Sequence, residues 1–119
     1  MWERILTYNK AMITIDDFLK VEVKIGTVLN AEEVPETDKL LRLMVDLGEE
    51  NPRQIVSGIK EYVKNPEDLV GKQLSFVTNL APRVIKGLES NGMLFAVGEG
   101  KTFAFVKPHK KVPPGTSAH

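Results

Sequence analysis

The 119-residue chain carries 16 basic and 16 acidic side chains and no cysteine, which fits one domain that folds without disulfides. No apolar run approaches the roughly 18 residues that cross a bilayer, and the first residues lack the basic-then-apolar pattern of a signal peptide. We therefore expect a chain that neither spans a membrane nor is secreted. The absence of cysteine agrees with a cytoplasmic location.

The neutral total hides an uneven distribution of charge. Residues 1–60 hold 8 basic and 11 acidic side chains, whereas residues 61–119 hold 8 basic and 5 acidic ones. Such asymmetry permits a basic face on a neutral protein, as in proteins that bind nucleic acid. An ordinary solvated surface is the alternative.

The sequence pattern at the N-terminus favours a helix. Residues 1–13 are predicted to form an N-terminal helical extension, because Trp2, Ile5 and Leu6 fall on one helical face. This extension would cap the domain or pack on a second subunit. Thr14 then precedes two aspartates, a pattern that predicts a capped helical turn.

Three strands are predicted next. Apolar and charged residues alternate from Leu19 to Ile25, Gly26 interrupts the alternation, and apolar residues resume at Val28. This pattern predicts one long, bent strand, with a bulge or a sharp coil at Gly26. Further strands at 40–47 and 53–57 follow short polar turns, as in an antiparallel meander. No crossover helix separates them, so a parallel sheet is disfavoured.

The second half contains one short helix and more strands. Asn65 is predicted to cap a helix that begins at Pro66 and ends by Gly71. Strands are predicted at 72–78 and 93–97, with a small final strand at 102–106 and a proline-rich edge or strap at 107–115. This order predicts an all-β chain, an OB-fold, which is a five-stranded Greek-key barrel, over residues 14–119.

A polar, basic loop at residues 79–93 is the predicted functional site. It is long for a connection between neighbouring strands, and long ordered loops are more often functional than idle. In an OB-fold it joins strands four and five. That loop, the loop between strands one and two, and one sheet face commonly bind oligonucleotides.

Short motifs spread over residues 14–115 have counterparts, in the same order, in one family. The motifs are Asp17–Val21, Gly26–Val28, Asp38–Leu40, Val45–Gly48, Gln54–Ile59, Leu69–Lys72, Asn79-Leu80 with Pro82, and Gly87 followed by Ser90 and Gly92-Met93. Through them the chain resembles the tRNA-binding domain family. That family includes free-standing dimeric tRNA-binding proteins, the C-terminal domain or beta subunit of methionyl-tRNA synthetases, and a cytokine-precursor domain.

The resemblance implies a non-catalytic module that binds tRNA by shape, usually as a homodimer with its C-terminal tail at the interface. It would act in translation, free-standing or as a methionyl-tRNA synthetase beta subunit that enhances tRNA binding. The alternative is a dimeric protein-interaction or chaperone-like module on the same OB scaffold, since a related dimeric branch is associated with protein secretion. No cofactor, metal or catalytic residue is expected, because no nucleophile, acid–base or ligand constellation is present.

Five loop residues are candidates for contact with tRNA. Arg83 and Lys86 are predicted to bind backbone phosphates. Asn79 and Ser90 would either hydrogen-bond to RNA or brace the loop's own backbone. Met93 would either contact a base or pack in the core.

The strands add two further candidates. Arg42 and Arg53 would extend the basic track or form surface ion pairs with nearby acids. The aromatic side chains on the predicted strands are expected in the core rather than as stacking platforms; they are Phe76, Phe95, Phe103 and Phe105.

Overall fold

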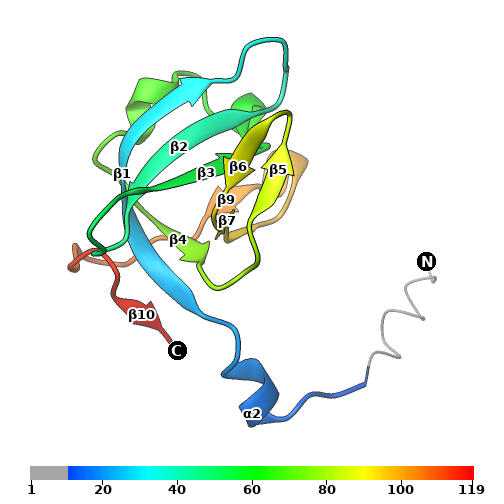
Figure 1. The fold of residues 1–119 in the computed structure, drawn as a ribbon, viewed down its shortest axis with the longest axis vertical. Coiled ribbons are helices and arrows are strands. Elements are labelled where there is room, and N and C mark those ends of the chain that lie inside the picture. The colour runs from blue at the N-terminus through cyan, green and yellow to red at the C-terminus, as the bar shows by residue number, and fades with distance from the viewer. Residues whose placement is uncertain (1–10) are drawn as a thin grey trace.

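Strand β1 (Val23–Glu33) connects the two halves of a barrel in the computed structural model, which describes residues 11–119 (Figure 1). The first half of β1 pairs with β4 (Gln73–Val77), with Val23 opposite Val77. The second half pairs with β2 (Leu41–Asp46), with Thr27 opposite Asp46. One bent strand therefore serves both sides of the barrel, as the sequence predicted.

The remaining barrel strands complete an antiparallel order of β3-β2-β1-β4-β7. Strand β3 (Arg53–Ser57) pairs with β2, and β7 (Met93–Leu94) pairs with β4. These five strands form a nearly closed barrel with only short helical turns outside it. The predicted all-β, OB-type fold is confirmed.

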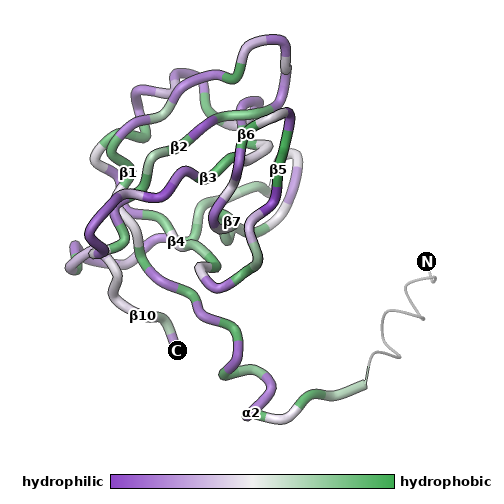
Figure 2. The backbone as a smooth tube through the Cα atoms, in the orientation of Figure 1, coloured by the Kyte–Doolittle hydropathy of each residue, from purple (hydrophilic) through white to green (hydrophobic). Residues whose placement is uncertain are grey.

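The core follows from the two-residue period of the strands. Leu41, Leu43 and Val45 of β2 are 0% exposed, and the residues between them point outward. Phe76 of β4 is also 0% exposed. Each such side chain stabilises the fold by about 1.5–3 kcal/mol through burial. Figure 2 shows that the barrel strands contain both hydrophobic and hydrophilic residues.

Gly26 serves a different purpose from the one predicted. The register shift in β1 lies between Val28 and Asn30, so a bulge at Gly26 itself is wrong, although β1 does pass from pairing with β4 to pairing with β2 at Thr27. A Cβ at Gly26 would lie 2.5 Å from Cγ1 of Val45 and 2.9 Å from Cδ2 of Leu47. Glycine is needed here because core side chains pass directly over the backbone of β1.

Short helical turns precede β1 and separate β3 from β4. Helix α2 (Ile15–Phe18) begins at Thr14, whose hydroxyl accepts from the Asp17 N–H, which confirms the predicted cap. The helix predicted after Asn65 is the single 3-10 turn η2 (Pro66–Leu69), with Asn65 as its cap, and another 3-10 turn, η1 (Lys60–Tyr62), precedes it. The predicted extension at 1–13 falls mainly outside the described residues. Within residues 11–119 no helix is long and apolar enough to cross a bilayer.

The loop predicted at 79–93 contains a hairpin of its own. Strands β5 (Arg83–Ile85) and β6 (Leu88–Ser90) pair around Lys86 and Gly87, which have φ values of 51° and 81°. A two-residue turn with positive φ at both positions matches the twist of the two strands that it joins. The sequence predicted a loop here and did not indicate this hairpin.

The last two predicted strands are shorter than expected. The predicted strand at 93–97 divides at Phe95 into β7 and β8 (Ala96–Val97). After the 3-10 turn η3 (Gly100–Thr102), β9 (Ala104–Phe105) pairs with β8 in a small separate sheet.

The proline-rich tail is a strap, as predicted. The Gly115 N–H donates to the Ile25 carbonyl at 2.7 Å, and the Ile25 N–H donates to the Thr116 carbonyl at 2.8 Å. Strand β10 (Ser117–Ala118) then pairs with the first residues of β1. The tail is therefore part of the barrel's hydrogen-bonded frame.

We predict that Gly26→Ala destabilises the fold by about 1–3 kcal/mol, because the added methyl overpacks the core. Gly58→Ala is the matched control, since its nearest neighbour would be the Lys39 carbonyl oxygen at 3.9 Å. Urea unfolding measures both variants. A Gly26→Ala protein as stable as Gly58→Ala would contradict the close approach described here.

Candidate nucleic-acid interface

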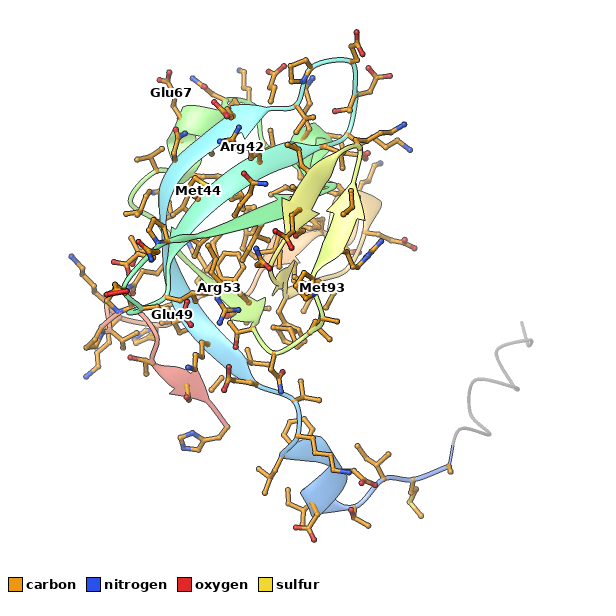
Figure 3. All side chains as sticks on the ribbon, in the orientation of Figure 1. Arg42, Met44, Glu49, Arg53, Glu67 and Met93 are labelled. Carbon is orange, nitrogen blue, oxygen red and sulfur yellow. The ribbon has the colours of Figure 1, made fainter. Side chains whose placement is uncertain are left out.

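A groove of about 530 Å³ runs between the outer face of β2 and β3 and the segment around the hairpin. Met44 and Gln54 are paired across β2 and β3, and Arg53 lies beside them. Figure 3 shows Met44 and Arg53 on this face of the barrel. The other lining residues are Pro52, Leu80, Pro82, Glu89 and Asn91.

Arg53 holds three segments together at one end of the groove. Its Nε and Nη2 donate to the two carboxylate oxygens of Glu49 at 2.8 and 2.7 Å. Its Nη1 donates to the carbonyls of Thr78, at 2.6 Å, and Asn91, at 3.3 Å. The ion pair weighed for Arg53 is therefore present, and its charge is shared with a glutamate.

The Arg53 hydrogen bond lowers the pKa of the Glu49 carboxyl. The same hydrogen bond raises the pKa of Arg53. Two parallel bonds between a guanidinium and a carboxylate give a fixed geometry as well as attraction. The pair thus fixes the turn between β2 and β3 against the end of β4.

Arg42 also takes part in an ion pair. Its Nη1 lies 3.0 Å from Oε1 of Glu32, the residue directly opposite on β1. Its Nε is buried and has no hydrogen-bond partner among the described residues. Arg42 comes before Met44 on β2 and does not line the groove (Figure 3).

Asn79 and Ser90 both brace the backbone. Asn79 donates from Nδ2 to the Lys20 carbonyl at 2.6 Å and accepts from the Glu22 N–H at 2.9 Å, which holds the chain as it enters β1. The Ser90 hydroxyl accepts from the Val56 N–H of β3 at 3.0 Å. It also donates to the Gly92 carbonyl at 3.0 Å, and the side chain is buried.

Three predicted residues come together beneath the hairpin. Arg83, Ser90 and Met93 line a small pocket of about 50 Å³. Arg83 is exposed, lies opposite Ser90 in the hairpin, and forms no ion pair within residues 11–119. Met93 is 45% exposed, so it lies at the surface instead of filling the core.

Lys86 lies at the tip of the hairpin, away from these three. It lines a separate groove of about 400 Å³ together with Glu36, Asp38 and Lys39 of the β1–β2 loop. The loops joining strands one to two and four to five therefore meet, as expected of this barrel. The two acids weaken the positive field of the lysines, because opposite charges at short range partly cancel.

Most residues that line the groove around Met44 and Arg53 were not predicted from the sequence. The outward phase of β2 and β3 would have indicated Met44 and Gln54, whereas no local pattern indicated Leu80, Pro82, Glu89 or Asn91. The core prediction is confirmed for Phe76 and wrong for Phe95, which is 43% exposed at the break between β7 and β8. The other two aromatics, Phe103 and Phe105, are partly buried against the core.

Residues 23–117 match the family model of the tRNA binding domain. The chain belongs to this family. It is 49% identical over 111 residues to methionine–tRNA ligase of Methanococcoides burtonii, covering 92% of this chain and 16% of that protein. It is 50% identical over 103 residues to methionine–tRNA ligase of Thermotoga maritima, covering 87% of this chain and 16% of that protein. The chain thus spans about a sixth of these curated relatives.

Solved structures of similar size share the fold. The MetRS-related protein from Pyrococcus horikoshii has a TM-score of 0.84 and 35% identity, covering 92% of this chain and 100% of that one. The chaperone CsaA from Bacillus anthracis has a TM-score of 0.80 and 34% identity, with the same coverage of both chains.

We predict that Ser90→Ala destabilises the fold by about 1–3 kcal/mol, since the buried Val56 N–H loses its acceptor. Ser57→Ala, beside Val56 on β3, is the control, because no hydrogen bond of the Ser57 hydroxyl is found in the part of the chain described. Thermal unfolding measures both. If Ser90→Ala kept full stability, Ser90 would not brace the barrel.

The Glu49–Arg53 pair also predicts a pH dependence. Because the Glu49 pKa is lowered in the folded state, the pair stabilises the fold above the usual glutamate pKa of about 4.3. That contribution is lost as pH falls through the folded pKa. Urea unfolding between pH 7 and pH 3 should show that Glu49→Gln loses less stability on acidification than the parent protein. Equal losses would contradict the coupling.

Proposed function

We propose that this chain is a non-catalytic tRNA-binding module whose main RNA contact is the β5–β6 hairpin and the adjoining groove. The observation that carries the proposal is the exposed, unpaired Arg83 of the described chain beside the groove, on the barrel of a tRNA binding domain. Sequence-independent RNA binding depends chiefly on phosphate contacts, and a guanidinium is well suited to them.

The other candidate residues contribute to RNA binding to different extents in this proposal. Lys86 binds a neighbouring phosphate from the hairpin tip. Met93 and Phe95 offer exposed apolar surface on which an unpaired base can pack. Arg42 and Arg53 are secondary contacts, because each already shares its charge with a glutamate.

Asn79 and Ser90 act as a frame that sets the position of the hairpin instead of touching RNA. The Ser90 hydroxyl both donates and accepts a hydrogen bond within the protein. The Asn79 side chain does the same with two backbone groups of the chain before β1. A substitution at either residue would then weaken RNA binding only through the hairpin's geometry.

The relatives support tRNA as the partner. The chain corresponds to a small part of methionine–tRNA ligases, and we propose that it raises a synthetase's hold on tRNA, as a free-standing protein or a beta subunit. The chemistry of aminoacylation would then belong to the synthetase. This role places it in translation in the cytoplasm.

We further propose a homodimer joined through the segment before β1. Helix α2 has no buried residue and lies away from the barrel (Figure 1). Green, hydrophobic positions occur along this segment in Figure 2. Exposed apolar surface of this extent favours a protein partner, and a second copy supplies one. The exposed large apolar residues of the segment are Met12, Ile13, Ile15, Phe18, Leu19 and Val21.

A chaperone-like or protein-interaction module is the second candidate function. The likeness to chaperone CsaA favours it, as do exposed apolar residues near the hairpin, namely Leu80, Val84, Met93, Phe95 and Val97. Gel filtration of the protein with total tRNA and, separately, with an unfolded polypeptide distinguishes the two. Comigration with the polypeptide alone would favour the chaperone-like role.

We predict that Arg83→Gln/Lys86→Gln weakens tRNA binding and lowers the slope of log affinity against log salt by about 1.5, the value for two lost phosphate contacts. Lys64→Gln/Lys101→Gln removes two exposed lysines that line none of the grooves described above and should change neither quantity. Gel-shift titration at several salt concentrations measures both. Unchanged binding by the hairpin variant would refute this site.

The dimer is tested by substitution, because deleting the tail would also remove β10. Phe18→Asp/Leu19→Asp changes two exposed side chains before β1 and should convert a dimer into a folded monomer. Sedimentation velocity measures the mass, and circular dichroism checks the fold. A monomeric parent protein would exclude the dimer.

A further inference from the structure

The C-terminal strap crosses β4 on the side of the barrel opposite the β5–β6 hairpin (Figure 1). At one end, the Ser75 hydroxyl donates to the Val106 carbonyl at 2.7 Å. At the other end, Gln73 donates from Nε2 to the Val112 carbonyl at 2.7 Å and accepts from the Val112 N–H at 3.1 Å. Two residues of β4 therefore fix both ends of the segment 107–111.

Between these fixed ends lies a groove of about 280 Å³ whose lining is strongly basic. Lys72 enters it from the turn before β4, and the strap contributes three more lysines and a histidine. No acidic residue lines this groove, and within residues 11–119 none of the four lysines forms an ion pair. The basic lining residues are Lys72, Lys107, His109, Lys110 and Lys111.

Four ammonium groups around one groove repel one another, and an anion between them relieves that repulsion. The chain has 16 basic and 16 acidic residues, so the acids that balance its total charge lie outside this groove. The fixed backbone adds to the effect, because a strap already held at both ends loses little freedom on binding. The strap groove, defined by these five residues, is thus suited to a multiply charged anion.

The lining also limits which anion fits. None of the lining residues is an exposed large hydrophobic side chain, so the groove lacks the apolar anchor of a membrane-binding surface. Lysines bind phosphate as point charges, without selecting a particular base. These features favour the phosphodiester backbone of RNA over a lipid surface.

We propose that the strap groove is a second RNA-backbone site, which binds phosphates of the same tRNA that the hairpin contacts. The proposal rests on the proposed tRNA-binding function. Because hairpin and strap lie on opposite sides of the barrel, their simultaneous use favours a folded RNA that extends around the module. A short single strand at the hairpin would not reach the strap.

The test uses Lys110→Gln/Lys111→Gln in the full chain, with Lys64→Gln/Lys101→Gln as the charge-matched control. Gel-shift titration with total tRNA should show several-fold weaker binding for the strap variant and a salt slope lower by about 1.5. The control should match the parent. The strap variant keeps Gln73 and Ser75, so its thermal unfolding midpoint should be unchanged.

Two results separate failure of this proposal from failure of the proposed function. If the strap variant binds tRNA like the parent while the hairpin variant is weakened, the second site is refuted and the tRNA-binding function stands. If the parent binds no tRNA, the function fails and RNA is excluded as the ligand of the strap groove.

A titration with sodium tripolyphosphate, followed in amide proton–nitrogen spectra, tests the groove's anion chemistry without RNA. Saturable shifts at residues 107–112 of the parent, lost in the Lys110→Gln/Lys111→Gln variant, support an oligophosphate site. Absent shifts, or equal shifts around all exposed lysines, overturn it. Displacement of tripolyphosphate by poly-glutamate of matched charge but not by tRNA would replace RNA with an acidic protein partner and so overturn the proposal.

Discussion

The seam between β3 and the end of β6, including Asn91 directly after it, closes the barrel, and a few hydrogen bonds hold it. The Asn91 N–H donates to the Gln54 carbonyl at 2.8 Å, and the Gln54 side chain donates to the Glu89 carbonyl at 2.9 Å. Ser90 supplies the acceptor for the buried Val56 N–H. The hairpin that carries Arg83 is positioned by this seam, so closure of the fold and placement of the site depend on the same contacts.

This arrangement explains why the most polar loop residues differ in their roles. Ser90 satisfies the buried Val56 N–H, which would be costly to leave unpaired, and Asn79 braces the exposed backbone before β1. Arg83 and Lys86 instead project from a hairpin that needs neither charge for its own pairing. Arg53 lies between these cases, because it lines the groove while joining three segments. Within residues 79–93, the charged side chains proposed to bind RNA are therefore different residues from the side chains that hold the backbone in place.

The sequence predicted the barrel because local patterns determine it: alternation gave β2 and β3, and Thr14 and Asn65 gave the two caps. The hairpin was missed because Lys86, a residue without special turn preference, occupies a position with positive φ. The role of Gly26 and the exposure of Phe95 depend on packing between distant segments. Ion pairs were one of the two alternatives predicted for Arg42 and Arg53, and both are present. Their glutamate partners could be identified only from the three-dimensional structure.

The proposed function requires RNA to bind along the hairpin and the groove beside it. An amide proton–nitrogen titration of the labelled protein with tRNA tests this requirement. We expect the largest changes at residues 80–93 and on the outer face of β2 and β3. Changes confined to residues 11–21, or no saturable change at all, would contradict it.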